Sequence, residues 1–185
     1  MEREHGPMRP GEDDRASLDA EFSDLVAAGW RRWTHAAWLL TRDRDDAEDL
    51  VQQVLTRTYA AWPRVRTLDA HAYVRRALVN AYLDGYRRRR LLRFVPASHD
   101  DRLLDRRLDD EGEAAGDRTD LRALLATLTP RERAVVVLRH YLDQSQAETA
   151  ESLGLPPGTV AATLKRALAR LRVAATDPTP QEVPR

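Results

Sequence analysis

The sequence predicts an all-α protein of two small helical domains joined by a flexible linker, the C-terminal domain being a helix-turn-helix. Three observations predict this architecture. Apolar residues recur at three- and four-residue steps over most of the chain, as on one face of a helix. No stretch alternates polar and apolar residues like a strand over a useful length. A polar, acidic segment at residues 94–120 interrupts the helical pattern and separates the two halves.

The composition excludes several classes of protein. There is no cysteine, so disulfide scaffolds, thiolate zinc sites and cysteine nucleophiles are excluded. No apolar run approaches the roughly 20 residues that span a bilayer, and the polar N-terminus does not resemble a signal peptide. We therefore expect a cytoplasmic protein with no membrane partner. The 30 basic and 30 acidic side chains cancel, but local patches rather than net charge decide nucleic-acid binding.

The N-terminal half predicts a tail followed by three helices, the domain covering residues 18–93. Residues 1–17 are polar and rich in Gly, Pro and charge, which predicts a disordered tail. The first helix starts at Leu18, and its inner stripe is Phe22, Leu25, Val26, Gly29, Trp30, Trp33, Ala37 and Leu40. Asp43 caps the second helix, and Pro63 ends it. Its stripe is Ala47, Leu50, Val51, Val54, Leu55, Thr58 and Trp62. Asp69 caps a third helix, which runs to Arg90.

The segment 94–120 is predicted to be a flexible acidic linker. Its residues 96–120 hold nine acidic residues and four arginines, with two glycines and a proline. A short helix around Leu103–Leu108 is compatible with this composition. Helical periodicity resumes at Leu121, so the second domain is expected at 121–175. Residues 176–185 hold three prolines and are interpreted as a tail.

The segment from Thr129 to Arg172 has the spacing of a helix-turn-helix. Thr129 can cap a helix with Pro130 at its first position and Glu132 reaching back to the cap. The short helix of Gln144–Gly154 follows, with glycine in the tight turn and Ala150 where two helices pack closely. The inner stripe of the last helix is Val160, Leu164, Ala167, Leu168 and Leu171.

The outward face of the last helix is the predicted DNA-reading surface. Thr159, Ala162, Thr163 and Arg166 are candidates for base edges, and Lys165, Arg170 and Arg131 for phosphates. The alternative is an amphipathic helix pair with a basic, solvated face.

A cluster of acidic and amide side chains opens the second helix. It consists of Asp45, Asp46, Glu48, Asp49, Gln52 and Gln53. Acidic residues in a first turn favour the helix dipole and need no partner. A carboxylate cluster can also bind a metal, although no histidine supports one here. The third interpretation is a docking face for a basic partner protein.

The third helix of this domain is strongly basic. Residues 64–93 contain nine arginines and two acidic residues. Arg76, Asn80 and Asp84 share one face at four-residue spacing, with Arg87 and Arg88 a turn beyond. Tyr73, Tyr82 and Tyr86 lie between these residues in the sequence. Such a mixture of basic, amide and aromatic side chains suits a single nucleic-acid strand whose bases are stacked or flipped out. The alternative is a solvated basic helix end whose arginines complement the dipole.

Taken together, the chain resembles the extracytoplasmic-function (group 4) sigma factors of bacterial RNA polymerase, over nearly everything from Phe22 to Arg172. Four segments carry the resemblance: DRDDAEDLVQQVLTRTYAAW, AHAYVRRALVNAYLDGYRRRR, LTPRERAVVVLRHYLDQSQAETAESLGLPPGTV and LKRALARLR. Their order, the acidic linker and the overall length are together strongly specific. The Trp-rich first helix and the ALARLR ending look most like an actinobacterial subgroup.

The resemblance implies two helical domains, no catalytic residue, no metal and no cofactor. Residues 18–93 would be region 2, which binds the polymerase clamp helices and reads and melts the minus-ten element. The implied polymerase contacts are Asp45, Asp46, Glu48, Asp49, Leu50, Gln52 and Gln53, with Val54 nearby. The implied minus-ten contacts are Tyr73, Arg75, Arg76, Asn80, Asp84, Arg87 and Arg88. Residues 121–175 would be region 4, which contacts the polymerase flap and reads the minus-thirty-five element. Its implied contacts are Arg131, Thr159, Ala162, Thr163, Lys165, Arg166 and Arg170. The linker would thread toward the RNA-exit path.

Some positions depart from the family. Ala161 stands where a lysine or arginine is frequent, Ala162 and Thr163 where serine or arginine is frequent, and Thr149 where isoleucine is usual. Fewer basic groups at Ala161 and Ala162 would weaken or redirect minus-thirty-five recognition. Family members are often held inactive by an anti-sigma factor, which is therefore a further candidate partner.

Two other functions compete with a sigma factor. An independent regulator would pair the helix-turn-helix with a sensing or dimerising domain and bind duplex DNA unaided. An enzyme would use the carboxylate cluster, which would then have to converge in a pocket. An independent regulator and a sigma factor can be told apart by their DNA binding. The regulator binds DNA alone, whereas a sigma factor gains its affinity for DNA only with polymerase.

Overall fold

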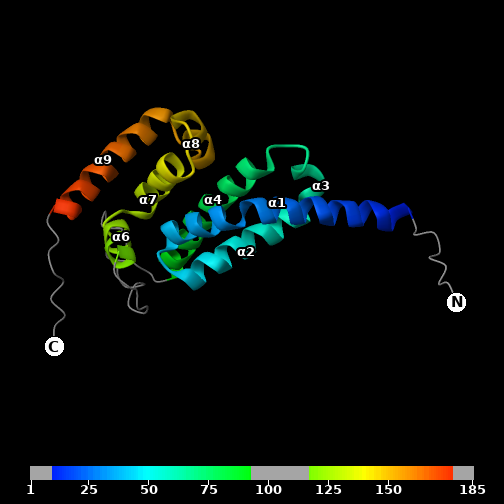
Figure 1. Cartoon of the computed structure of the whole chain (residues 1–185). Coiled ribbons are helices and arrows are strands. Elements are labelled where there is room, and N and C mark those ends of the chain that lie inside the picture. The colour runs from blue at the N-terminus through cyan, green and yellow to red at the C-terminus, as the bar shows by residue number, and fades with distance from the viewer. Residues whose placement is uncertain (1–9, 93–116, 177–185) are drawn as a thin grey trace.

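The computed structural model describes residues 10–92 and 117–176, and every regular element within these ranges is a helix (Figure 1). The N-terminal domain holds α1 (Pro10–Thr41), α2 (Arg44–Ala60), α3 (Trp62–Val65) and α4 (Ala70–Leu92). The C-terminal domain holds α6 (Asp117–Ala126), α7 (Pro130–Val136), the π-helical turn η1 (Val137–Tyr141), α8 (Gln146–Leu153) and α9 (Pro157–Thr176). The predicted all-α architecture is confirmed. None of the described helices has the length and apolar character that crossing a membrane requires.

The N-terminal domain forms because α1, α2 and α4 bury one apolar stripe each against the others. Trp33, Val51 and Leu78 are buried at the centre, as the three- and four-residue spacing predicts. Gly29 lets the Trp33 ring lie against the backbone of α1, since a Cβ there would meet ring atoms at 2.3 Å. Trp30 was expected on the inner stripe but is 39% exposed. It follows Gly29 by one residue, and a step of about 100° turns its side chain out of the stripe.

Predicted caps set the helix starts in this domain. The Asp43 carboxylate accepts a hydrogen bond of 2.8 Å from the Asp46 N–H at the start of α2. The Asp69 carboxylate accepts one of 2.9 Å from the Ala72 N–H at the start of α4. The second helix was expected to run up to Pro63, but α2 ends at Ala60. Pro63 instead occupies the first turn of α3, where its missing N–H costs nothing.

Two boundaries differ from the sequence prediction. The helical chain begins at Pro10, so residues 10–17 of the expected disordered tail belong to α1. The turns of α1 that follow this segment are bound to the rest of the domain: Tyr59 of α2 donates to Asp19 (2.6 Å), and Arg66 at the end of α3 pairs with Glu21 (2.7 Å). The expected linker is also shorter, because α6 begins at Asp117. Residues 1–9, the proposed helix around 103–108 and the tail 177–185 lie outside the described residues.

The C-terminal domain is built from short helices whose ends are closed by side chains. Thr129 and Glu132 form the predicted capping box at α7, and Ser145 and Glu148 form another at α8. Gly154 ends α8 with φ +61, a left-handed conformation that glycine adopts without strain. The turn between α8 and α9 is thereby fixed, as the helix-turn-helix spacing predicts.

The two domains pack against each other. One continuous hydrophobic cluster includes Leu40 and Leu78 of the N-terminal domain together with Leu128 and Leu138 of the C-terminal domain. Within the C-terminal domain, Val135, Ala150 and Val160 form a separate small core under the helix-turn-helix. The helix-turn-helix therefore has its own support, while α6, α7 and η1 share a core with α1 and α4.

Candidate nucleic-acid interfaces

Helix α9 presents a polar face at its N-terminal end. Thr159, Ala162, Lys165 and Arg166 are exposed, as predicted, and Ala161 lies beside them. The Gln146 side chain donates to the Pro157 carbonyl (3.0 Å), which ties the start of α8 to the start of α9. The pair α8 and α9, joined by a tight turn, thus holds this exposed face in place. In a helix-turn-helix, the second helix of such a pair enters the major groove of DNA.

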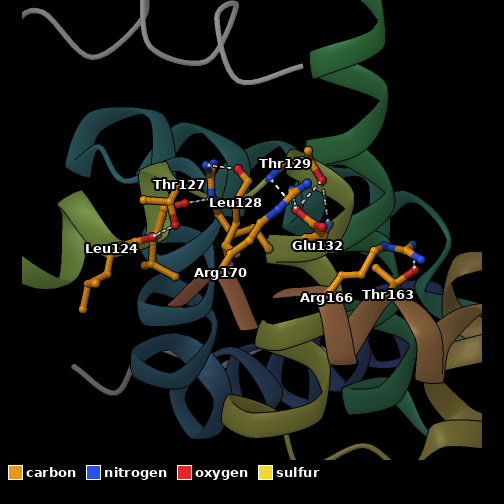
Figure 2. A network of polar contacts seen from close by, with 10 residues as sticks. Leu124, Thr127, Leu128, Thr129, Glu132, Thr163, Arg166 and Arg170 are labelled. Carbon is orange, nitrogen blue, oxygen red and sulfur yellow. Dashed lines mark hydrogen bonds and ion pairs between the residues drawn. The ribbon is translucent and has the colours of Figure 1, made fainter. Parts of the chain in front are cut away.

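Two predicted members of this surface do not face outward. Thr163 is 2% exposed, and its hydroxyl accepts a hydrogen bond from Arg166 (3.2 Å; Figure 2). The expectation that Thr163 faces outward is wrong, because its position three residues after Val160 and four before Ala167 places it on the inner stripe. Arg170 is half-buried and ion-paired with Glu132.

The pairing of Arg170 has a local cause. The Glu132 side chain accepts from the N–H (3.0 Å) and the hydroxyl (3.1 Å) of Thr129, so the capping box holds it in place (Figure 2). Glu132 is 4% exposed, and a buried carboxylate requires a cation nearby. Arg170 supplies that cation from α9, so its guanidinium binds α9 to α7 rather than projecting toward a phosphate. Arg131, by contrast, is exposed.

Helix α4 carries the predicted basic surface. Tyr73, Arg76, Asp84, Arg87 and Arg88 are exposed, and Arg75 and Asn80 are half-buried. Asp84 and Arg87 form an ion pair of 2.7 Å along the helix. Tyr82 and Tyr86 are buried, at 5% and 6% exposure. Of the three interleaved tyrosines, only Tyr73 is therefore available for stacking on a base.

The start of α2 forms the predicted acidic face. Asp45, Asp46, Asp49, Gln52 and Gln53 are exposed, and Glu48 is half-buried and paired with Arg44 (3.2 Å). Leu50 and Val54 were expected to join this face but are 9% and 1% exposed. Both belong to the core stripe that packs against α1 and α4, so the face is mainly polar. Leu50 also lines the adjacent hollow, and the contact expected through it stays a prediction.

A hollow of about 380 Å³ lies between α2 and α4. Asp46, Asp49 and Gln53 line one side, and Arg88 and Arg89 line the other. An acidic wall therefore faces a basic one, which suits a partner that carries both signs of charge. Among the described residues, no group of three or more His, Cys, Asp or Glu could hold a metal ion.

Arg133 is a residue that the sequence analysis missed. It is fully buried and donates to the carbonyls of Leu125 (3.1 Å), Leu128 (3.1 Å) and Leu40 (3.0 Å) and to the Tyr82 hydroxyl (3.0 Å). The first two acceptors lie in its own domain and the last two in the N-terminal domain. A signal was present: Arg133 falls four residues before Val137, on the apolar side of its helix.

Further contacts between the domains involve residues that are far apart in sequence. Arg32 of α1 donates to Asp143 (3.0 Å) and to the Tyr141 carbonyl (3.4 Å). The His35 ring stacks on Tyr141 at 4.9 Å. Arg76 of α4 pairs with Glu151 of α8 (3.2 Å). No local spacing reveals such pairs, because the partners are separated by 75 residues or more.

Comparison with known protein families gives two matches that follow one another along the chain. Residues 31–91 match the Sigma-70 region 2 family, and residues 118–171 match Sigma-70, region 4.

Several known proteins are similar to most of the chain. The RNA polymerase sigma-E factor of Streptomyces avermitilis is 41% identical over 153 residues, covering 82% of this chain and 83% of that protein. The sigma-E factor of Streptomyces coelicolor is 40% identical over 153 residues, with 82% and 84% covered. The ECF RNA polymerase sigma factor SigL of Mycobacterium tuberculosis is 31% identical over 165 residues, with 86% and 89% covered.

Two solved structures share the fold. One is CnrH in complex with the cytosolic domain of CnrY, with a TM-score of 0.61, 24% identity, and 85% of this chain and 89% of that chain covered. The other is the sigma factor RpoE in complex with the anti-sigma factor NepR from Bartonella quintana, with a TM-score of 0.62, 21% identity, and 84% and 97% covered. At these identities, the likeness concerns the fold alone.

Proposed function

The chain belongs to the sigma-70 family of RNA polymerase sigma factors, and from this membership we propose how its surfaces divide the work of initiating transcription. It is a promoter-recognition factor of the extracytoplasmic-function type, whose partners are core RNA polymerase and promoter DNA. The observation that carries the proposal is the order of the two family matches. Regions 2 and 4 follow each other in one chain, and each exposes a polar face on a helix.

We assign residues 18–93 to polymerase binding and minus-ten recognition. The exposed acidic and amide side chains of α2 form the polymerase-docking face, with Leu50 in the lining of the adjacent hollow. The exposed side chains of α4 form the minus-ten surface, and basic groups beside the exposed Tyr73 support the binding of an unpaired strand. This surface consists of the exposed Tyr73, Arg76, Asp84, Arg87 and Arg88 together with the half-buried Arg75 and Asn80.

We assign residues 121–175 to minus-thirty-five recognition and to contact with the polymerase flap. The exposed face of α9 is narrower than the sequence predicted, because Thr163 is buried and Arg170 is paired with Glu132. Thr159, Ala162, Lys165 and Arg166 remain for the bases and nearby phosphates, with Arg131 as a phosphate contact. With Ala161 and Ala162 side by side, this face depends more on apolar contact and less on charge.

The proposal extends to three general properties. Sigma factors are regulatory initiation factors, and we propose that this chain has no catalytic activity of its own. We place it in the cytoplasm, where its polymerase is. We also propose an anti-sigma factor as a partner, because the fold is shared with sigma factors such as RpoE, whose structure was solved with the anti-sigma factor NepR.

The docking face is tested by reversing its charge. Asp49 and Gln53 lie four residues apart on the exposed side of α2, and changing both to lysine should abolish binding to core polymerase. The matched control changes Asp24 and Ala28 of α1, also exposed and four residues apart, to lysine. The control adds the same charge elsewhere and should bind normally.

Both variants should retain the melting temperature of the wild type, because all four positions are exposed. Binding is measured by native gel shift of core polymerase. Equal binding by the two variants would contradict the assignment of the docking face. A collapse of the melting temperature in the Asp49 and Gln53 variant would show that the acidic turn is structural.

A further inference from the structure

The buried hydroxyl of Thr163 forms a hydrogen bond that the packing of its helix does not need. Thr163 is 2% exposed, and its hydroxyl accepts from the Arg166 guanidinium at 3.2 Å (Figure 2). Val160 and Ala167 fill the buried positions on either side of it in α9 with apolar side chains. A valine would fill the place of Thr163 without a polar group that needs a partner. Packing therefore explains the shape of this side chain but not its hydroxyl.

The Thr163 hydroxyl is also used differently from those of several other helical threonines. The hydroxyls of Thr41, Thr58 and Thr176 each donate to the backbone carbonyl four residues earlier. This is the ordinary bond of a threonine in a helix, and it satisfies the hydroxyl within its own turn. The Thr163 hydroxyl instead accepts from a charged side chain one turn later. The bond therefore restrains the guanidinium of Arg166 from a buried, immobile position.

Arg166 differs in this respect from the other basic side chains of the proposed minus-thirty-five surface. Arg166, Lys165 and Arg131 are all exposed. Within residues 10–92 and 117–176, neither Lys165 nor Arg131 forms a hydrogen bond or an ion pair. A long basic side chain has many rotamers, and a bond to a buried group removes much of that freedom before a ligand binds. Arg166 is therefore pre-organised, while Lys165 and Arg131 keep their rotamer freedom.

We propose that Thr163 is a positioning residue that aims Arg166 at a guanine of the minus-thirty-five element. The inference rests on the proposed role of α9 in reading that element. Guanine presents its O6 and N7 acceptors in the major groove, and arginine can bind both at once. After the bond to Thr163, the guanidinium keeps enough N–H donors for both atoms of one base.

Two simultaneous hydrogen bonds to one base require a fixed orientation of the guanidinium, whereas attraction to a phosphate does not. The anchored Arg166 thus suits the reading of a base. Lys165 and Arg131 suit contacts to the phosphate backbone.

The test separates the hydroxyl of Thr163 from its shape. Thr163→Val keeps the shape and removes the acceptor, Thr163→Ser keeps the acceptor and removes a buried methyl group, and Arg166→Ala removes the reader. The matched control is Thr149→Val, the same substitution at a buried threonine of α8 whose hydroxyl has no hydrogen-bond partner among the described residues. Each full chain is combined with core polymerase and a pool of DNA whose promoter region is randomised, each molecule carrying a barcode in its transcript.

The readout is the preference for each base at each promoter position. In the wild type, we expect a guanine preference at one position that Arg166→Ala abolishes. Thr163→Val should weaken the preference at that same position about two- to tenfold, because Arg166 then has to be ordered on binding. Preferences at the other positions should not change. Thr163→Ser and Thr149→Val should keep all the wild-type preferences.

Melting temperatures should follow a different order, which separates positioning from stability. The loss of a buried methyl group leaves a cavity, so Thr163→Ser should be the least stable of the three threonine variants. A guanine preference that is lost in Thr163→Ser and kept in Thr163→Val would follow stability and would overturn the proposal.

Two further results would overturn it. One is a Thr163→Val variant with wild-type preferences. The other is an Arg166→Ala variant that lowers transcription from all promoters alike, as the loss of a phosphate contact would. Each leaves the proposed function intact, because the wild-type chain still directs transcription by core polymerase. If the wild-type chain and core polymerase transcribed no promoter of the pool, the proposed function would fail, and this inference with it.

Discussion

Replacing Arg133 by methionine removes a buried guanidinium while keeping most of its apolar stem. In the native protein, this group donates to the carbonyls of Leu125 and Leu128 in its own domain. It also donates to Leu40 and Tyr82 of the other domain. The variant leaves these acceptors without their donor in a place where water has little access.

The size of the effect follows from these contacts. A buried acceptor left without a partner costs about 1–3 kcal/mol. Leu125 keeps a hydrogen bond from the Leu128 N–H (3.2 Å), and the Tyr82 hydroxyl can rotate, so the carbonyls of Leu128 and Leu40 dominate. Methionine avoids the desolvation of a charged group, which offsets part of the loss. We expect the free energy of unfolding to fall by about 2–4 kcal/mol.

Urea denaturation followed by circular dichroism measures this change as a lower midpoint at an unchanged slope. Arg131→Met is the matched control, because it is the same substitution two residues earlier at an exposed position. It should alter stability by less than about 0.5 kcal/mol. If Arg133→Met were as stable as Arg131→Met, the Arg133 network would contribute nothing net and the reasoning would be refuted.

Three further substitutions test local features. Gly154→Ala should cost about 1–2 kcal/mol in urea denaturation, because φ is +61 there although the added Cβ meets nothing within 4 Å; a neutral result would contradict the left-handed turn. Gly29→Ala should lower the melting temperature although alanine favours helix, because its Cβ would lie 2.3 Å from the Trp33 ring; stabilisation would show that the ring is free to move. Hydrogen bonds from Ser145 lower the pKa of Glu148, so its stabilising effect is present above the unfolded pKa and lost as pH falls through the lower folded value. The stability difference between wild type and Glu148→Gln should therefore vanish in acid, and a difference that is constant with pH would refute this.

Local signals predicted the helices and their caps well. Thr129 and Glu132, Asp43, Asp69 and Gly154 act as the sequence indicates, because capping depends on residues within one turn of each other. The inner stripes were mostly right for the same reason. Trp30 was predicted to be buried and Thr163 to be exposed, and both predictions were wrong. Both residues lie at the edge of an apolar stripe, where the rotation of about 100° between neighbouring residues decides between core and surface.

Contacts between distant residues were beyond the reach of local patterns. Arg133 looks like an ordinary helix arginine until Leu40 and Tyr82 are brought to it from the other domain. Arg170 looks like a phosphate contact until Glu132, 38 residues earlier, is placed beside it. The candidate DNA and polymerase surfaces were thus predicted as regions, while the burial of Leu50 and Thr163 and the pairing of Arg170 required the tertiary structure.

Transcription with purified components tests the central claim most directly. Core RNA polymerase and DNA carrying a matched promoter are combined with and without the chain, and the transcripts are mapped. The chain should form a stable complex with core polymerase and produce transcripts that start at the promoter only when it is present. No stable complex, under conditions in which another sigma factor binds the same core, would contradict the claim.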